Sequence, residues 1–327
     1  MDIPIIDGIF LVFQFFWYIL YIMLAICFVF KIISDGKCES DTTSFLYHFV
    51  ANSVFDIIQS LAIIVFQKFL HWKILVQFFL TSTWIKRVYG PIGYISIIGL
   101  ILGHLIAVVN RYCALYHCIT FRTFWTKKTC LRLIFLQYCI PIVILSHNVF
   151  YEAKVVYVPS FDIFIFSLTD KWINIVNSVI FVGISVISAI ITATLNIVIF
   201  RKYNKVVAKG SGKERSKRLL MLSYMAVTTI CLIIFAIEQL VRLYFSIGKK
   251  NDGLIIISFT LFWIIPSLTI MQPIMTLIMS KNLRDYFLSF YFKRFLPIKK
   301  PASNSTNFRT TVAVTTGKNL KSNQKII

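Results

Sequence analysis

The chain has 327 residues, of which 58% are hydrophobic and only 14% charged, and its formal net charge is +21. Soluble domains have close to half apolar and a quarter charged residues, whereas the apolar residues here come in blocks of roughly 20, enough to cross a ~30 Å hydrocarbon layer. These values exclude a pair of soluble domains as well as collagen-like, disordered and disulfide-scaffold chains, and they predict a membrane protein with several spans.

Apolar blocks bounded by charged residues follow one another along the chain. In lipid, backbone groups find partners only within a helix or a closed barrel, and these runs are continuous, whereas barrel strands alternate with period 2. We therefore predict an all-α membrane protein, a seven-transmembrane helix bundle within residues 9–280. The predicted spans are about 9–33, 45–67, 89–111, 131–152, 172–200, 219–247 and 254–280.

Segments outside these spans have their own patterns. Residues 67–88 are apolar but interrupted by basic residues and too short to span, which predicts a loop or short amphipathic helix at the interface. Residues 1–8 are expected to be an extracellular tail, and residues 297–327, rich in Ser, Thr, Asn and Lys, a disordered cytosolic tail. A juxtamembrane amphipathic helix is predicted over 281–296, because apolar residues recur there at helical spacing: Leu283, Tyr286, Phe287, Phe290 and Tyr291.

Basic residues are divided unequally between the two sides of the predicted bundle. Of 34 Lys and Arg, 25 fall on connections 1, 3 and 5 plus the carboxyl tail, and 8 fall on connections 2, 4 and 6. The amino-terminal tail has none and carries Asp2 and Asp7. The positive-inside rule then predicts an external amino terminus and a cytosolic carboxyl terminus. The net charge thus indicates a cytoplasmic leaflet and membrane lipids as neighbours, and we expect no nucleic-acid partner.

An acidic residue, Asp56, lies near the middle of the second predicted span, one turn after Asn52. Ionisable groups inside a bilayer are costly and are functional candidates by default. Two interpretations stay open. Asp56 is either a packing residue hydrogen-bonded to a polar group such as Asn196 or Gln272, or a part of a conformational switch.

The third predicted span contains Gly99 and Gly103 at the G-x-x-x-G spacing, which is typical of close helix contact. His104 follows directly. We expect it to be a buried neutral histidine satisfied by a neighbour, with a pH-sensitive role as the alternative.

Glu238 and Arg242 are i,i+4 neighbours near the outer end of the sixth span. They either neutralise one another on one helix face or line an external cavity, and we predict that both face the bundle. Apolar cavities with a few convergent polar groups are the usual form of small-molecule sites, so we expect a small, mostly apolar ligand. The candidate ligand-binding residues are Glu238, Arg242, His147, Asn148, Trp172 and Trp263.

Residues 108–118, at the predicted cytosolic end of the third span, read VVNRYCALYHC. A lone arginine there could snorkel to phosphates, but Asn110, Arg111 and Tyr112 occur together. The stretch is similar to the Asp-Arg-Tyr end of the third helix in rhodopsin-like G-protein-coupled receptors, with Asn in place of the acid. The NRY form followed by an aromatic–His run resembles the nematode serpentine chemoreceptors of the Srg superfamily, class gamma or class V, and the likeness covers the helical core and the helix that follows it.

The resemblance implies a G-protein-coupled chemosensory receptor in the plasma membrane of sensory neurons, with a small extracellular ligand and a heterotrimeric G protein as partners. The sequence departs from the rhodopsin-like pattern, because Gln272-Pro273 replaces Asn-Pro and no Cys occurs in 81–93 or 153–171 to form the disulfide common in such receptors. The coupling and switch residues implied are Asn110, Arg111, Tyr112, Asp56, Gln272 and Pro273.

Other functions find less support in the sequence. No G-x-S-x-G, H-E-x-x-H or glycine-rich phosphate loop occurs, and residues 254–280 contain no Lys that could bind retinal. We expect no enzymatic activity, no cofactor and no metal. The alternative is a ligand-gated channel or transporter of the seven-helix type. Repeats, broken helices or a polar filter would indicate it, and none is visible.

Overall fold

A computed structural model describes residues 5–34, 41–116, 121, 125–207, 212–248 and 251–292. The predicted cytosolic tail over 297–327 and the last residues of the predicted amphipathic helix lie outside this part of the chain. The chain divides into two compact units, Met1–Phe287 and Leu288–Ile327. The bundle belongs to the first unit, and the described part of the second is the last turn of a helix that ends at Phe292.

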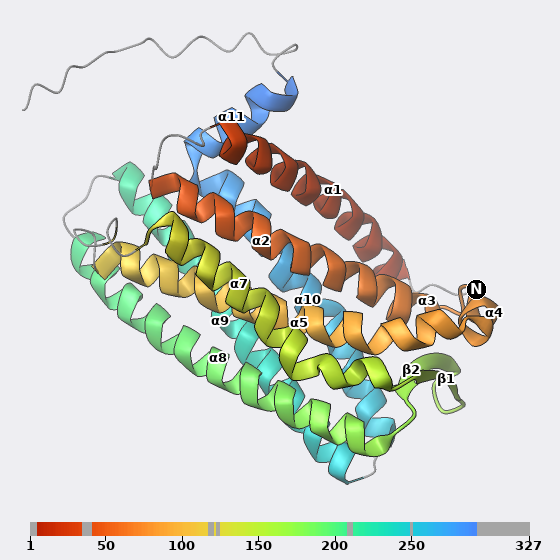
Figure 1. The fold of residues 1–327 in the computed structure, drawn as a ribbon. Helices are drawn as coiled ribbons and strands as arrows, with labels where there is room; N and C mark the ends of the chain where they lie inside the picture. Colours follow the sequence, from red (N-terminus) through yellow and green to blue (C-terminus); the bar gives the residue numbers. More distant parts are fainter. Residues whose placement is uncertain are drawn as a thin grey trace, which may run out of the picture. The chain divides into compact units, whose positions relative to one another are not determined.

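Within the described residues, seven helical segments are long and apolar enough to cross a membrane, which confirms the predicted all-α bundle. The second segment continues α2 through a π-helical segment at Ile63–Lys68 and the short α3 (Phe69–His71). The fourth ends in a 3-10 turn at Ser146–Phe150. The long helices in Figure 1 are α1 (Ile5–Ser34), α2 (Asp41–Ala62), α5 (Thr83–Tyr116), α7 (Lys127–Leu145), α8 (Lys171–Val207), α9 (Gly212–Ile247) and α10 (Asn251–Met279).

The second span is longer than predicted. The sequence predicts an end at residue 67, with Lys68 in a connection, but the helix continues to His71 and the Lys68 side chain is buried. The predicted short interfacial helix is present as α4 (Val76–Thr81), which follows Leu75 in the left-handed conformation with φ 56°. The error arose because a charged residue was taken as the end of an apolar run.

A β-hairpin that was not predicted joins α7 to α8. Its strands are β1 (Ala153–Val158) and β2 (Ile163–Leu168), paired antiparallel with Ala153 opposite Leu168. The turn contains Asp162 at φ 52°. The hairpin contacts α3, α5 and α8, and it lies at one end of the bundle in Figure 1. We call this the hairpin end, and the opposite end, where α5 ends at Tyr116, the Arg111 end.

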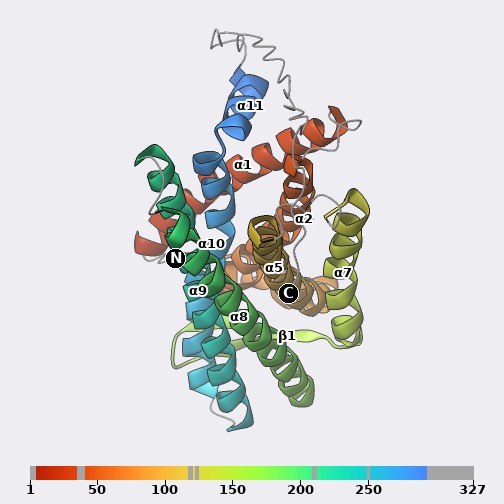
Figure 2. The ribbon, with the colours of Figure 1, turned by 90° about the vertical axis from the view of Figure 1, so that its left-hand side faces the viewer.

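The two glycines of the third span allow close packing, as predicted. A Cβ added to Gly99 would lie 2.5 Å from the ring of Phe55 in α2, and one added to Gly103 would lie 2.5 Å from Oδ1 of Asn52. The helices α2, α5, α7, α8, α9 and α10 contribute side chains to the main apolar core, and Figure 2 shows these helices from a second direction. Its central side chains include Phe55, Ile98, Phe235 and Ile265.

The helix predicted after the seventh span is α11 (Lys281–Phe292). In the first unit, Leu283 and Phe287 are buried, and the ammonium of Lys31 lies 4.5 Å from the centre of the Tyr286 ring. The apolar face predicted from the sequence therefore packs against the bundle over at least its first two turns.

Candidate functional site

A cavity of about 310 Å³ opens at the Arg111 end between α2, α5, α9, α10 and the start of α11. Three of the predicted coupling residues, Asn110, Arg111 and Gln272, line it together although they come from two different spans. The remaining polar lining comes from His48, Asn52, Tyr224, Thr276 and Ser280. Both ring nitrogens of His48 and Oε1 of Gln272 are buried and have no hydrogen-bond partner among the described residues, so the cavity offers unused polar groups.

Arg111 spans the cavity from α5 to α9. Its guanidinium carbon lies 4.5 Å from the centre of the Tyr224 ring, within the range of a cation–π interaction. Tyr224 is buried and packs with Ile199, Met225 and Met275. The contact therefore fastens the ends of α5 and α9 to each other. Tyr224 is not predictable from the sequence, because nothing in a single sequence indicates which ring faces Arg111.

Tyr112 does not line this cavity. Its ring stacks on that of Tyr116 with centres 4.8 Å apart, and the Tyr116 hydroxyl donates to the carbonyl of Val198 in α8 over 3.0 Å. Lys202 donates to the carbonyl of Leu115 over 2.7 Å and lies 4.1 Å from the Tyr116 ring centre. This part of the motif fixes α5 against α8, whereas Arg111 contacts α9.

Asp56 is buried at 2% exposure and accepts a hydrogen bond of 2.5 Å from the hydroxyl of Tyr21 in α1. The partners suggested from the sequence are therefore wrong. Asn196 instead donates to Oγ1 of Thr229 in α9 over 2.7 Å, and Gln272 lines the cavity. Tyr21 was missed because the register between α1 and α2 is not readable from two uniformly apolar spans.

Two further predicted residues lie inside the bundle. Pro273 is buried within α10, which continues through it to Met279. His104 is buried as expected, but its Nε2 has no hydrogen-bond partner among the described residues. The hydrogen bond expected from a neighbouring residue is therefore not formed at Nε2 by any described residue.

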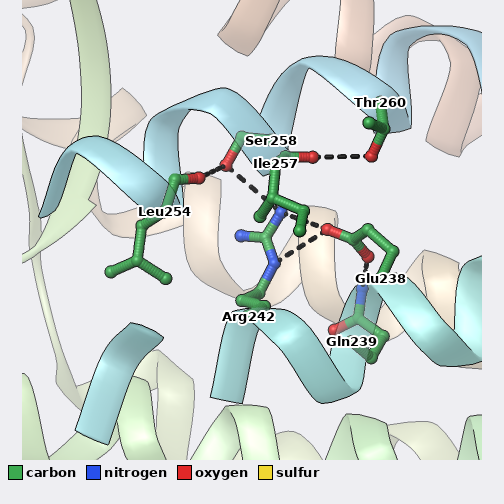
Figure 3. Close-up of polar contacts among 7 residues, drawn as sticks. All are labelled: Glu238, Gln239, Arg242, Leu254, Ile257, Ser258 and Thr260. Atoms are coloured by element: carbon green, nitrogen blue, oxygen red, sulfur yellow. Dashed lines mark hydrogen bonds and ion pairs between the residues drawn. The ribbon is translucent and has the colours of Figure 1, made fainter. Parts of the chain in front are cut away.

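At the hairpin end, Glu238 and Arg242 join α9 to α10 (Figure 3). The Glu238 side chain is 3% exposed, and its Oε1 accepts from Nε and Nη2 of Arg242 over 3.1 and 2.8 Å. Gln239 donates to the other carboxylate oxygen. Nη2 of Arg242 also reaches Oγ of Ser258 in α10 over 3.2 Å. The pair lies within the bundle, where it neutralises itself and still leaves Nη1 of Arg242 without a hydrogen bond to the described residues.

His147 and Asn148 form a second, separate cluster with Asn177 of α8. Asn148 is completely buried and exchanges two hydrogen bonds with Asn177, over 3.1 and 2.7 Å. Nε2 of His147 lies 2.9 Å from Oδ1 of Asn177. These polar groups satisfy one another across the end of α7 and the start of α8.

The two predicted tryptophans do not point into the bundle. Trp172 is 67% exposed and Trp263 42% exposed, and the Trp263 ring contacts Phe10 of α1 with centres 4.5 Å apart. Their placement in an interior cavity is wrong. Both lie in helices that are apolar on every side, so the sequence contains no signal for which side faces the core.

The fold defines a multi-pass membrane protein with seven spans and a polar cavity at one end. No group of three His, Cys, Asp or Glu side chains in the described segments is placed to hold a metal ion. A family model described as Srg family chemoreceptor matches residues 11–287. The chain therefore belongs to the Srg family of chemoreceptors, which confirms the resemblance seen in the NRY motif. None of the curated proteins matches it.

Proposed function

We propose that the protein is a chemosensory receptor that binds a small extracellular ligand at the hairpin end and signals to a heterotrimeric G protein through the Arg111 end. Membership of a chemoreceptor family supports the sensory role. The observation that carries the coupling role is the cavity, which collects Asn110, Arg111 and Gln272 at the end of the bundle. A receptor of this kind needs neither a catalytic residue nor a cofactor.

The charge distribution supports an external hairpin end. Most Lys and Arg residues belong to the connections and the tail on the opposite side, and basic residues accumulate on the cytoplasmic side. Burial of Lys68 in the second span removes one basic residue from the external count, which sharpens the asymmetry. In this orientation the cavity opens to the cytosol, where a G protein would reach it. By resemblance to the family, the membrane is the plasma membrane of sensory neurons.

The contact between Arg111 and Tyr224 supplies a simple switch. While it holds, α5 and α9 are fastened side by side at the cavity. When α9 moves away, the guanidinium is released and becomes available to a partner that enters. Gln272 and Pro273 lie on α10 beside this path, and Asp56 is tied to α1 deeper in the bundle. We assign these three residues to the transmission of ligand binding toward the cavity.

The test uses Arg111→Ala in cells that express a promiscuous G protein. Because Arg111 is the group that the partner would contact, basal nucleotide exchange is expected to fall to the level of cells without receptor. An epitope tag at Met1, labelled on intact cells, measures surface expression, which should not change. Labelling of intact cells also requires that the amino terminus is external. Arg132→Ala removes an exposed arginine of α7 and should leave exchange unaltered. Undiminished exchange from well-expressed Arg111→Ala would contradict the proposal.

A further inference from the structure

Lys68 is a buried lysine inside the second span. Its side chain is 1% exposed and belongs to the last turn of the π-helical segment Ile63–Lys68. An ionisable group at membrane depth is costly unless it is paired, and such groups mark functional sites. π-helical segments also occur often at functional sites, because they re-aim the side chains that follow.

The ammonium of Lys68 has no counterion in direct contact among the described residues. Its one hydrogen bond to the described residues runs to Oε1 of Gln14 in α1, over 3.3 Å. An ammonium has three donors, so two of them are unused. No carboxylate of the described residues lies within 4 Å of it, and Asp7 in the first turn of α1 acts on it only over a longer distance. Arg242, in contrast, contacts Glu238 directly.

Several buried polar atoms on residues near Lys68 in space or in sequence are also unpartnered among the described residues. Nε2 of Gln14 and Nε1 of Trp72 are buried donors with no hydrogen-bond partner among the described residues, and Nδ1 of His71 is also unpartnered. These atoms come from α1 and from the end of the second span. The unused donors of Gln14 and Trp72, two residues that contact the Lys68 ammonium, are suited to an anion that accepts hydrogen bonds.

Aromatic rings enclose the same ammonium. It lies 5.3 Å from the ring centre of Phe10, 5.9 Å from that of Trp72 and 6.0 Å from that of Phe262. Ring faces attract a cation, so these walls contribute favourable contacts to the ammonium of Lys68. They also present an apolar surface on which the hydrocarbon part of a ligand can pack.

We propose that Lys68, together with Gln14, His71 and Trp72, binds the carboxylate of a small organic acid whose apolar remainder lies against Phe10 and Phe262. A carboxylate has two oxygens that accept several charge-assisted hydrogen bonds, which matches the unused donors. The site is in the last turn of the second span, next to the hairpin end. The assignment of the acid as the sensed ligand rests on the proposed function, whereas the binding site itself does not.

The test measures binding of hexanoate to the purified full-length protein in phosphatidylcholine nanodiscs, with empty discs subtracted. Hexanamide is the neutral probe of nearly the same shape. Hexanoate should bind saturably and hexanamide at least about tenfold more weakly, because the charge-assisted contacts are lost. Lys68→Met should weaken hexanoate binding by at least about tenfold, whereas Lys154→Met, at an exposed position of β1, should not.

A second variant keeps the test decisive if Lys68→Met folds poorly. Gln14→Glu places a carboxylate where the amide oxygen lies, 3.3 Å from the ammonium. This internal anion should preserve or raise the thermal unfolding midpoint and abolish hexanoate binding. Hexanoate that binds equally to both variants and the parent, or does not bind to the parent, would overturn the proposal.

A competition measurement distinguishes an acid that enters the site from the bilayer from one that enters from water. Oleic acid built into the discs competes with hexanoate if the site is filled from the bilayer, and does not compete if it is filled from water. Because binding is read without a G protein, hexanoate binding without nucleotide exchange defeats only the coupling proposal. Exchange by the parent together with unchanged binding by Lys68→Met defeats only the carboxylate site.

Discussion

The two ends of the bundle are held together by different interactions. At the hairpin end, ion pairs at the surface join separate elements. Nζ of Lys73 lies 2.5 Å from Oδ2 of Asp162 in the hairpin turn, and Nε of Arg87 in α5 lies 2.6 Å from Oε1 of Glu152. At the Arg111 end, a cation–π contact and apolar packing surround a cavity of about 310 Å³.

The difference indicates which end can move at low cost. Inside the hairpin end, the Asn148–Asn177 and Glu238–Arg242 pairs satisfy one another, so separating either pair would leave buried groups without partners. At the Arg111 end, separating α5 from α9 breaks one ring contact and opens a space that already exists. The Arg87–Glu152 pair also joins the start of α5 to the segment before β1, the two regions that lack the cysteines for a disulfide.

The largest effect is expected inside the hairpin end. Asn177→Leu leaves the completely buried Asn148 amide without its reciprocal partner, and a buried unsatisfied polar group costs about 1–3 kcal/mol. Chemical unfolding in micelles should show a loss of stability of that size. Leucine at both Asn148 and Asn177 should recover part of it, because no orphaned amide remains.

The matched control for this cluster is Asn174→Leu. Asn174 lies one turn earlier on α8 and is half-buried, so its replacement should change stability much less. Equal losses from the two single variants would mean that the hairpin end does not depend on its buried polar pairs, and the contrast between the two ends would be lost.

A smaller effect is expected at the Arg111 end from Tyr224→Leu. The substitution removes the ring over the guanidinium, and a cation–π contact contributes about 0.5–2 kcal/mol. If the contact holds the closed arrangement, basal nucleotide exchange should rise by on the order of 2- to 30-fold. Tyr224→Phe keeps the ring and should keep the parent's basal exchange. A basal rate that is equal in the parent and in Tyr224→Leu would show that this contact does not restrain α9.

The smallest effect concerns the ion pair at the hairpin turn. Lys73 and the hydroxyl of Tyr157 both donate to Asp162 and hold the pKa of its carboxyl below the usual range. The stabilisation is therefore present above the unfolded pKa of about 4 and is lost as the pH falls through the lower folded pKa. The hydrogen bond that the Tyr157 hydroxyl donates to Asp162 raises the pKa of Tyr157.

Amide hydrogen exchange in β1 and β2 tests this expectation. At neutral pH, Asp162→Asn should exchange somewhat faster than the parent, and the difference between the two proteins at equal pH should vanish once Asp162 is protonated. A difference that persists at low pH would show that the variant acts through the left-handed turn conformation rather than through the ion pair.

The sequence was sufficient for the number of spans, because apolar run length alone decides whether a helix can cross a bilayer. It was also sufficient for the close packing at Gly99 and Gly103, since only small side chains allow that approach. It did not predict that Trp172 and Trp263 point outward. A helix surrounded by lipid is apolar on all sides, and its hydrophobic pattern therefore does not indicate which residues face the core.

The hairpin has a signal in the sequence. Residues 153–158 and 163–168 are rich in β-branched and aromatic residues and are separated by a short turn that contains Pro159 and Asp162. The contact of Arg111 with Tyr224 has no such signal in the sequence, because it depends on the rotation of α9 relative to α5. The motif thus identified the arginine but not the ring that holds it.

The π-helical segment Ile63–Lys68 has a consequence for insertions and deletions in the second span. An α-helix turns about 100° per residue, and a π segment accommodates one residue more than an α-helix of the same rise. Deletion of a single residue between 63 and 67 would thus restore regular α geometry and leave Lys68 directed toward Gln14, with little change in hydropathy or span length. In related chains, a one-residue gap at this point would leave the same side chain facing α1, so an alignment column for Lys68 would have to be assigned by helix register rather than by counting residues along the span.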